Sequence, residues 1–496
     1  MDRKKIKLFI ALTVAMFLAA VEGTIVVIAV PTIAKDLMGF EYISSIFSAF
    51  FLVAAVSTPL YGKLADLYGR KKMLTIGMII FTVGSLLCGL SQSMLMLIIA
   101  RAVQGLGAGA IFTIAFTIVG DAYTLEEKPK VMGGLSSIWG IASLVGPFIG
   151  GFLIDTFSWH WIFLAGVPLG VLSIIVLHVS LEDNFERSKP IIDYAGITVF
   201  TLALLSFLAV FMANDFLGWE TWVFLSTFLG ATLALLVLFY FIEKKAPEPL
   251  LPFNIFTKVT ILVNLVSFLL AVILIGIDMY IPIYIQDVLG YSALISGLAF
   301  APMSASWIIA SVVLGNLIPR FGAKGVVLIS NSMLLASAVL LIFIGANTTI
   351  WAIIIITFIM GAGFGGAWTT LTIVIQSSVR YAQRGAAMGA NALFRTLGHT
   401  IGISILGSAF NFFIARYYIQ RGVTDIDLSN LYSSLSATES LIPGDQVRMA
   451  INTGLDYVYI VFIAIATLCV LLTLLTPEIT IDDEEETADE KWGEAR

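Results

Sequence analysis

The chain has 496 residues, of which 59% are hydrophobic and only 12% are charged. Its mean hydropathy is +0.99. Soluble proteins carry roughly 25% charged residues, so the composition excludes a soluble enzyme, a nucleic-acid-binding protein and a disordered chain. Membrane-spanning helices of about 20 apolar residues each explain the composition.

The net charge of −6 is concentrated in one segment. Residues 477–496 hold nine acidic residues against Lys491 and Arg496, and the rest of the chain is close to neutral. We interpret 477–496 as an acidic cytoplasmic tail. Cys88 and Cys469 both lie in apolar stretches, so no disulfide or metal site is expected.

A basic N-terminal segment leads into an apolar stretch that ends near Pro31. The stretch is too long for a signal peptide and lacks a small-residue cleavage site, so we interpret it as the first span. Polar breaks then predict an all-α integral membrane protein with fourteen spans. Their approximate ranges are 8–34, 43–65, 73–90, 95–120, 131–154, 160–181, 191–213, 220–243, 259–286, 292–318, 325–345, 350–377, 386–415 and 453–476.

The distribution of basic residues predicts the orientation. Fourteen crossings place both termini on the same side, and 21 Lys and Arg residues then lie on that side against four on the other. Because cytoplasmic loops are enriched in Lys and Arg, both termini are expected in the cytoplasm. The segment 416–452 is expected to be an extracellular loop.

Three motifs recur along the chain at a nearly constant offset. A duplicated six-helix unit explains this: 1–182 would be an N-terminal half, 183–245 an inserted pair of helices and 246–476 a C-terminal half. Two similar halves around a cleft are typical of transporters, and neither a channel nor a membrane enzyme requires them. The matching segments are 62–71 with 315–324, 105–109 with 361–365, and 132–146 with 388–402.

The predicted inner loop after the second span contains Gly62, Asp66, Gly69 and Arg70. Asp66 and Arg70 are four residues apart and can pair if the helix continues, and Asp121 at the inner end of the fourth span can add a second acid. The alternative is that basic residues here only anchor the topology. The spacing resembles the loop signature of the major facilitator superfamily, which implies a latch at the inner gate.

The fourth span contains Arg101, Gln104 and the glycines of 105–109. A charge within a span is costly and usually faces the bundle interior with a partner. The alternative is that Arg101 extends to the outer membrane surface. The Arg-x-x-Gln-Gly pattern resembles the fourth-span motif of the same superfamily, which implies a role in proton transfer.

The fifth span contains Gly146, Pro147, Gly150 and Gly151. Proline frees a backbone carbonyl and glycines let a neighbouring helix approach, so a kinked packing helix would explain the string. The string also resembles the motif that marks antiporters in the superfamily, which implies export rather than import.

Glu22 lies in the middle of the first span. A carboxylate there is costly unless it is paired or protonated, and this suits a group that loads and releases a proton. The alternative is a structural carboxyl group hydrogen-bonded between helices. Residues 22–31 resemble the first-span signature of the fourteen-span drug:proton antiporters, which implies that Glu22 takes part in proton coupling and substrate binding.

Asp278 is the acidic residue well inside the spans of the second half, about one turn from the counterpart of Glu22. It can bind substrate, or it can reach outward or cap a neighbour. Asp287, at the end of the same span, is expected to face water.

Asn391, Arg395 and His399 form a polar stripe on the thirteenth span because they are four residues apart. Arg395 needs an anion, which can be Asp278, a substrate group or backbone carbonyls. We expect Asn391 and Arg395 to bind substrate, and the alternative is a structural pair between helices.

Trp139, Trp307, Phe364 and Trp368 lie in the middle of spans. Aromatic linings suit flat apolar ligands and cations, so the three tryptophans are candidate substrate contacts. The alternative is that they pack or face lipid.

The resemblance covers 1–476 and implies a major facilitator fold and no enzymatic activity. We expect a monomeric, proton-coupled antiporter in a bacterial cell membrane that exports amphipathic, often cationic drugs by alternating access. Its partners would be small molecules, protons and membrane lipids, with no nucleic acid. The sequence has no Gly-x-x-x-x-Gly-Lys-Ser/Thr loop, so the proton gradient, and neither ATP nor a cofactor, is the expected energy source. The alternatives are a dedicated exporter of one lipid or metabolite and an ion channel.

Overall fold

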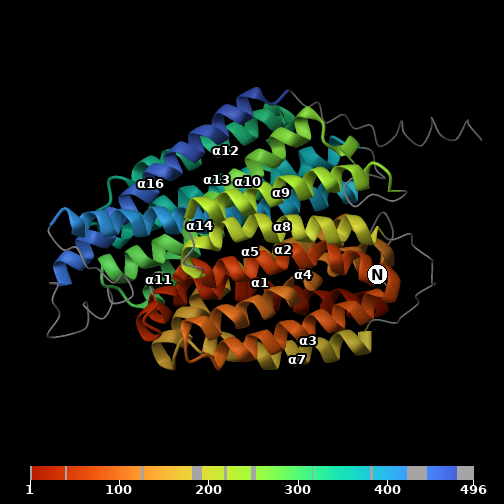
Figure 1. The fold of residues 1–496 in the computed structure, drawn as a ribbon, viewed down its shortest axis with the longest axis horizontal. Coiled ribbons are helices and arrows are strands. Elements are labelled where there is room, and N and C mark those ends of the chain that lie inside the picture. The colour runs from red at the N-terminus through yellow and green to blue at the C-terminus, as the bar shows by residue number, and fades with distance from the viewer. Residues whose placement is uncertain are drawn as a thin grey trace, which may run out of the picture.

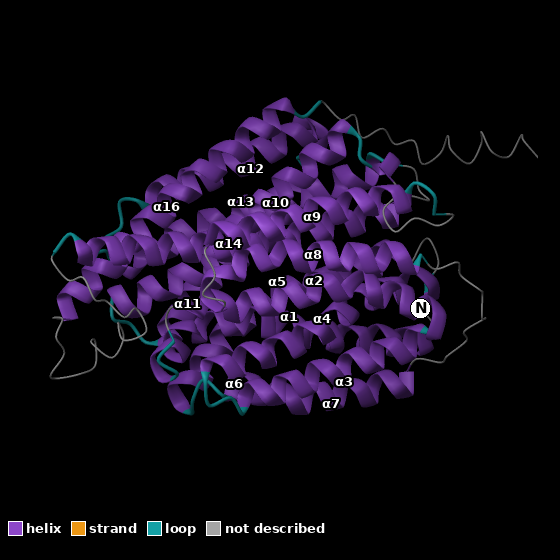
Figure 2. Ribbon diagram, in the orientation of Figure 1, coloured by secondary structure: helices purple, strands orange, loops and turns teal. Residues whose placement is uncertain are grey.

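A computed structural model describes residues 3–39, 42–123, 128–180, 193–216, 221–246, 253–315, 317–379, 384–421 and 444–477. These residues form helices joined by turns and loops, with no strand among them (Figure 2). In a membrane, a helix satisfies its own backbone hydrogen bonds, which explains why so apolar a chain adopts this architecture.

The helices of the first half occupy the first six predicted spans. They are α1 (Arg3–Asp36), α2 (Ile43–Tyr68), α3 (Arg70–Gly89), α4 (Met94–Ala122), α5 (Lys128–Thr156), and α6 (Trp161–Leu164) with α7 (Gly166–Ser180). The next two are α8 (Tyr194–Phe216) and α9 (Thr221–Glu243). The second half contains α10 (Lys258–Ile283), the π-helix η3 (Tyr284–Val288), α11 (Ala293–Gly315), α12 (Ile318–Leu341), α13 (Ile350–Ser377), α14 (Arg384–Ile419) and α16 (Gly444–Leu475), preceded by the 3₁₀ turn η2 (Phe253–Ile255).

Eleven helices within the described residues are long and apolar enough to cross a membrane. Shorter apolar helical stretches lie at Ser45–Thr58 in α2 and Tyr194–Phe207 in α8. The multi-span membrane fold is therefore confirmed, and the number fourteen stays a prediction. The division at 182 and 245 also stays a prediction, and most of the loop 416–452 and of the tail 477–496 lies outside the described residues.

The repeated motifs of the sequence have matching backbone geometry. Gly69, between α2 and α3, has φ +92°, and Gly322, its repeat partner inside α12, has φ +70°. Both values lie in the region that favours glycine. A Cβ on Gly105 of α4 would collide with the backbone of α2, and one on Gly361 of α13 would collide with that of α11. Equivalent helix pairs in the two halves thus pack through equivalent glycines.

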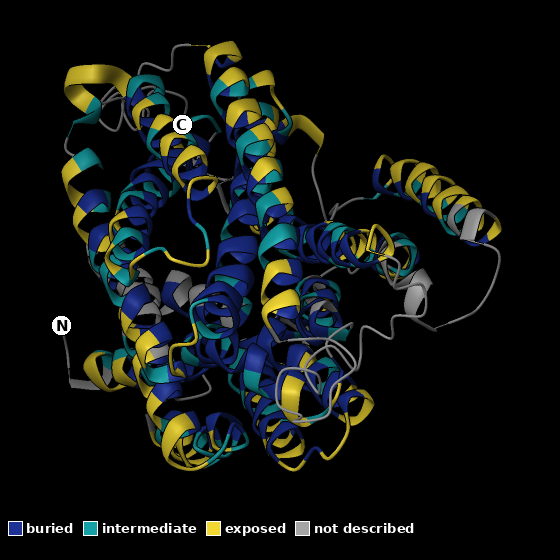
Figure 3. Cartoon of the chain, turned by 90° about the vertical axis from the view of Figure 1, so that its left-hand side faces the viewer, coloured by how far each residue is buried: buried dark blue, intermediate teal, exposed yellow. Residues whose placement is uncertain are grey.

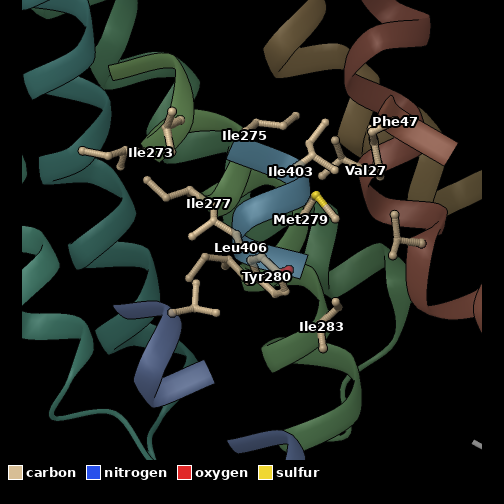
Figure 4. Packing of buried hydrophobic residues seen from close by; sticks show 14 of the residues in the cluster. Val27, Phe47, Ile273, Ile275, Ile277, Met279, Tyr280, Ile283, Ile403 and Leu406 are labelled. Carbon is tan, nitrogen blue, oxygen red and sulfur yellow. The ribbon is translucent and has the colours of Figure 1, made fainter. Parts of the chain in front are cut away.

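The two halves lie side by side in Figure 1, with α1–α7 below, most helices of the second half above, and α11 at the left at the level of α5. Contacts between them join α1 to α10, α2 to α14 and α5 to α11. One shared apolar core crosses the boundary, where Val27 and Phe47 lie near Met279 and Ile403 (Figure 4). Figure 3 shows buried residues between the helices and exposed residues on the outward faces. Many of the exposed residues are large and apolar, as expected of helices that face lipid.

Helices α8 and α9 pack mainly against each other. Phe200 and Phe239 form their own small apolar cluster, which reaches Val56 of α2 and Leu393 of α14. The pair therefore lies beside the boundary between the halves.

Candidate functional site

Glu22, in the middle of α1, has only 2% of its surface exposed. Its Oε1 accepts a hydrogen bond of 2.6 Å from Ser85 Oγ of α3. Its Oε2 accepts one from Gln104 Nε2 of α4. Two neutral donors from neighbouring helices therefore hold both carboxylate oxygens.

Gln104 connects this carboxylate to a buried cation. Its Oε1 accepts a hydrogen bond from Arg101 Nη1, while its Nε2 also lies 2.8 Å from Ser85 Oγ. Arginine can only donate, so the amide oxygen must face Arg101 and the amide nitrogen must face Glu22. The result is a continuous buried network, Arg101–Gln104–Glu22–Ser85, which we call the acid–amide–arginine network.

Arg101 is 1% exposed, so it does not extend to the membrane surface. Its guanidinium carbon lies 4.2 Å from the centre of the Phe50 ring of α2, and Nε lies 3.5 Å from the Ile46 carbonyl oxygen. The interior placement expected from the cost of lipid exposure is therefore what the structure has, with α2 supplying an aromatic face for the cation.

Two glycines make room for the network. A Cβ on Gly166, at the start of α7, would lie 2.7 Å from Glu22 Oε1. A Cβ on Gly84 of α3 would lie 2.5 Å from the Gln104 Cα. Both distances are shorter than real Cβ contacts, so larger residues at these positions would displace the carboxylate or the amide.

The glycine string of α5 packs this helix against both halves. Cβ atoms on Gly146 and Gly150 would collide with Thr24 and Ile25 of α1. A Cβ on Gly151 would lie 2.6 Å from the Leu294 Cα of α11, in the second half. The packing interpretation therefore accounts for these three glycines; the side chain of Pro147 lies outside the described residues, and the link to antiport stays a prediction.

Asp278, on α10, is half-buried, and it has no hydrogen bond or ion pair with any described residue. Arg395, on α14, also has no described acidic partner: Nη2 donates to Thr372 Oγ1 at 3.0 Å, and the guanidinium carbon lies 4.6 Å from the centre of the Trp368 ring. In the described residues, Arg395 and Asp278 are therefore not an ion pair.

Asn391 forms hydrogen bonds across the interface between α14 and α10. Its Nδ2 donates to Asn264 Oδ1 at 2.9 Å and to Ser267 Oγ at 3.0 Å, both on α10. These bonds fix α14 against α10, and the proposed contact with substrate stays a prediction.

Three of the predicted aromatic residues form one cluster. The ring centres of Trp307 and Phe364 are 5.4 Å apart, and those of Trp307 and Trp368 are 5.7 Å apart. The cluster lies between α11 and α13 and ends at Arg395. The side chain of Trp139 lies outside the described residues.

Polar contacts join the halves at the ends predicted to face outward. Lys35 Nζ of α1 lies 2.6 Å from Asp287 Oδ1 of η3, and Gln286 Nε2 donates to the Ile28 carbonyl oxygen at 3.2 Å. At the same outer ends, between α5 and α11, the Leu294 N–H donates to Asp155 Oδ2 at 3.0 Å. The expectation that Asp287 faces water is wrong, because only 4% of it is exposed.

The predicted inner latch cannot be traced in the same way. The structure does not describe the side chains of Asp66 and Asp121 or the surroundings of Gly62. Gly69 separates α2 from α3, and Arg70 begins α3. Pairing of Arg70 with the two acids stays a prediction.

Sequence reasoning missed Ser85, Gly166 and Thr372. A single serine, glycine or threonine in a span is common and carries no signal by itself. Only the packing of α3 and α7 against α1 shows that Ser85 and Gly166 lie beside Glu22, and this packing is known only from the fold.

Residues 12–403 match the Major Facilitator Superfamily. The multidrug transporter protein MdtP of Bacillus subtilis (strain 168) is 33% identical over 411 residues, covering 82% of this chain and 76% of that protein. The multidrug efflux pump SdrM of Staphylococcus aureus (strain N315) is 31% identical over 442 residues, covering 88% and 95%.

Solved structures agree on the fold. An auto inhibited POT family peptide transporter superposes with a TM-score of 0.67 at 14% identity, covering 96% of this chain and 98% of that one. A bacterial homolog of the human lysosomal transporter Spinster gives a TM-score of 0.64 at 16% identity, covering 96% and 97%. The all-helical architecture, the glycine-mediated repeat and the sequence match together show that this chain is a multi-span membrane transporter, and not an enzyme, of the Major Facilitator Superfamily.

Proposed function

We propose that the protein is a proton-coupled antiporter that exports amphipathic, often cationic drugs from the bacterial cytoplasm by alternating access. The observation that carries the proposal is the buried acid–amide–arginine network around Glu22. The names of MdtP and SdrM, a multidrug transporter and a multidrug efflux pump, support drugs as the cargo.

The chemistry of the network suits reversible protonation. The Ser85 hydroxyl can donate to an ionised Glu22 or accept from a protonated one, so the site can hold the group in both states. Protonation removes the negative charge that faces Arg101 through Gln104, and leaves a buried cation with less compensation.

This change can reach the boundary between the halves through α2. Arg101 contacts Phe50, and the next residue, Phe51, packs on His399 of α14 with ring centres 5.1 Å apart. Protonation would shift the balance between inward-open and outward-open states. The proton gradient as sole energy source, the monomeric state and cytoplasmic termini belong to the same proposal.

The test is efflux from vesicles that contain the purified protein and an imposed pH gradient. Glu22→Gln keeps the shape of the side chain but cannot ionise, so we expect it to abolish uphill export while downhill movement of substrate persists. Asp445→Asn, which removes an exposed carboxylate in the first turn of α16, is the matched control and should export normally. Uphill export by Glu22→Gln with unchanged pH dependence would place the coupling site elsewhere. A panel of cations, neutral compounds and lipids in the same vesicles separates broad export from export of one lipid or metabolite.

A further inference from the structure

Arg395 differs from Arg101 because no described hydrogen bonds link it to an acid, whereas Gln104 links Arg101 to Glu22. Its described contacts are the Thr372 hydroxyl at 3.0 Å and the face of the Trp368 ring at 4.6 Å. Its Nε is buried and has no hydrogen-bond partner. Neither contact carries a negative charge, so this cation is solvated by the protein but not neutralised by any described residue.

His399 places a second unpartnered nitrogen beside it. His399 follows Arg395 by four residues on α14, which puts both side chains on one face of the helix. Its Nε2 is buried and has no hydrogen-bond partner. Its ring packs on Phe51 of α2, so the two nitrogens lie where the halves meet, the position at which transporters of two-half architecture bind substrate.

The surroundings also provide a flat apolar face. The Arg395 guanidinium lies over the ring of Trp368, and Trp368 belongs to the aromatic cluster with Trp307 and Phe364. A planar guanidinium with free donors matches a carboxylate, which can accept two parallel hydrogen bonds. An aromatic body next to that carboxylate would then lie against the cluster.

We propose that Arg395 and His399 form an anion subsite that receives the carboxylate of an amphipathic aromatic substrate, with Trp368 against its ring system. The inference rests on the proposed export function and names a substrate class within it. The transporter would accept aromatic acids and zwitterions, and a cation without an acidic group would not use this subsite.

Two dyes with the same ring system separate the contribution of the carboxylate from that of the rings. Rhodamine 110 carries a free carboxylate, and rhodamine 123 is its methyl ester with the same ring system. Binding of each dye to the purified full-length protein in lipid nanodiscs is measured by fluorescence polarisation, and efflux is measured in vesicles. The variants are Arg395→Gln, Arg395→Lys and, as a control on the same helix, Arg416→Gln, which changes an exposed arginine.

Arg395→Gln should weaken binding of rhodamine 110 by about tenfold or more, since hydrogen bonds to charged groups are among the stronger ones. Binding of rhodamine 123 should change by less than about twofold. Arg395→Lys keeps the charge but loses the planar pair of N–H donors, so its affinity for rhodamine 110 should lie between those of the wild type and Arg395→Gln. Arg416→Gln should bind both dyes as the wild type does.

Three results would overturn the subsite. One is an equal loss of both dyes in Arg395→Gln and Arg395→Lys, which would make Arg395 purely structural. The others are unchanged binding of rhodamine 110 and a wild-type protein that binds neither dye. If binding discriminates as expected but neither dye is exported against a gradient, the subsite stands and the proposed export function fails.

Discussion

The two halves hold their buried charges in opposite ways. In the first half, Glu22 and Arg101 are joined through Gln104, and each charged group has a described hydrogen-bond partner. Among the described residues of the second half, Asp278 has no partner, and Arg395 contacts a hydroxyl and an aromatic ring but no acid. A closed network can respond to a proton with little rearrangement, whereas charges without counterions are available to a ligand. This difference supports the proposal that the first half couples to protons and that the second half recognises substrate charge.

The largest difference is expected when the central amide of each half is removed. Gln104→Leu removes the hydrogen bonds that Glu22 and Arg101 share, and each hydrogen bond to a charged group is worth about 1.5–3 kcal/mol. Asn391→Leu leaves only the neutral Asn264 and Ser267 unpaired, which costs about 1–3 kcal/mol. Thermal unfolding of both purified variants should show the larger loss of stability for Gln104→Leu. An equal or larger loss for Asn391→Leu would contradict the comparison.

A methyl group at Gly166 should disturb the network without removing any of its members. Gly166→Ala places a Cβ 2.7 Å from Glu22 Oε1, and overpacking of this kind costs about 1–3 kcal/mol. We expect export driven by a pH gradient to fall by about tenfold. Gly23→Ala is the control, because a Cβ on Gly23 would meet nothing within 4 Å. Normal export by Gly166→Ala would mean that the position of the carboxylate is unimportant.

Asp278 tests the second half with substrates of graded charge. A close pair of charges is worth a few kcal/mol at an effective dielectric near 20, before desolvation is subtracted. Asp278→Asn should therefore reduce efflux of divalent cations by about tenfold and that of monovalent cations by about threefold. Neutral compounds should be nearly unaffected. A uniform loss across the panel would make Asp278 structural.

The smallest effect is expected at the outer contact between the halves. Because Lys35 is 43% exposed in its pair with Asp287, Asp287→Asn should shift the population toward outward-open by at most about fivefold, the range of a weak ion pair. Spin labels at the exposed positions Met38 and Tyr291 report this opening as a longer distance, since Cys88 and Cys469 are buried. An unchanged distance distribution would show that the pair does not restrain opening.

Charges inside apolar stretches were the most informative feature of the sequence. Glu22 and Arg101 were predicted because a charge within a span is costly without a partner, and Gln104 was predicted from the resemblance of its motif. The structure brings all three into one network. The nearly constant offset between repeats predicted a duplicated unit, and the matching residues Gly105 and Gly361 both approach a neighbouring backbone.

Contacts between helices distant in sequence could not be predicted in this way. Ser85 binds Glu22 only because α3 lies beside α1, and a lone serine gives no sign of this. Asp287 was expected to face water because it lies at the end of a span, but the π-helix η3 carries it into the boundary, where it meets Lys35. The choice between Asp278 and a ligand as the partner of Arg395 likewise depends on three-dimensional distances.

The most direct test of proton coupling at Glu22 is the release of protons when substrate binds. A weakly buffered solution of the purified protein with a pH-sensitive dye receives rhodamine 123, and the released protons are counted against the bound dye. The wild type should release protons on binding, whereas Glu22→Gln should bind the dye and release none. Equal proton release by Glu22→Gln would contradict the assignment of proton coupling to the first half.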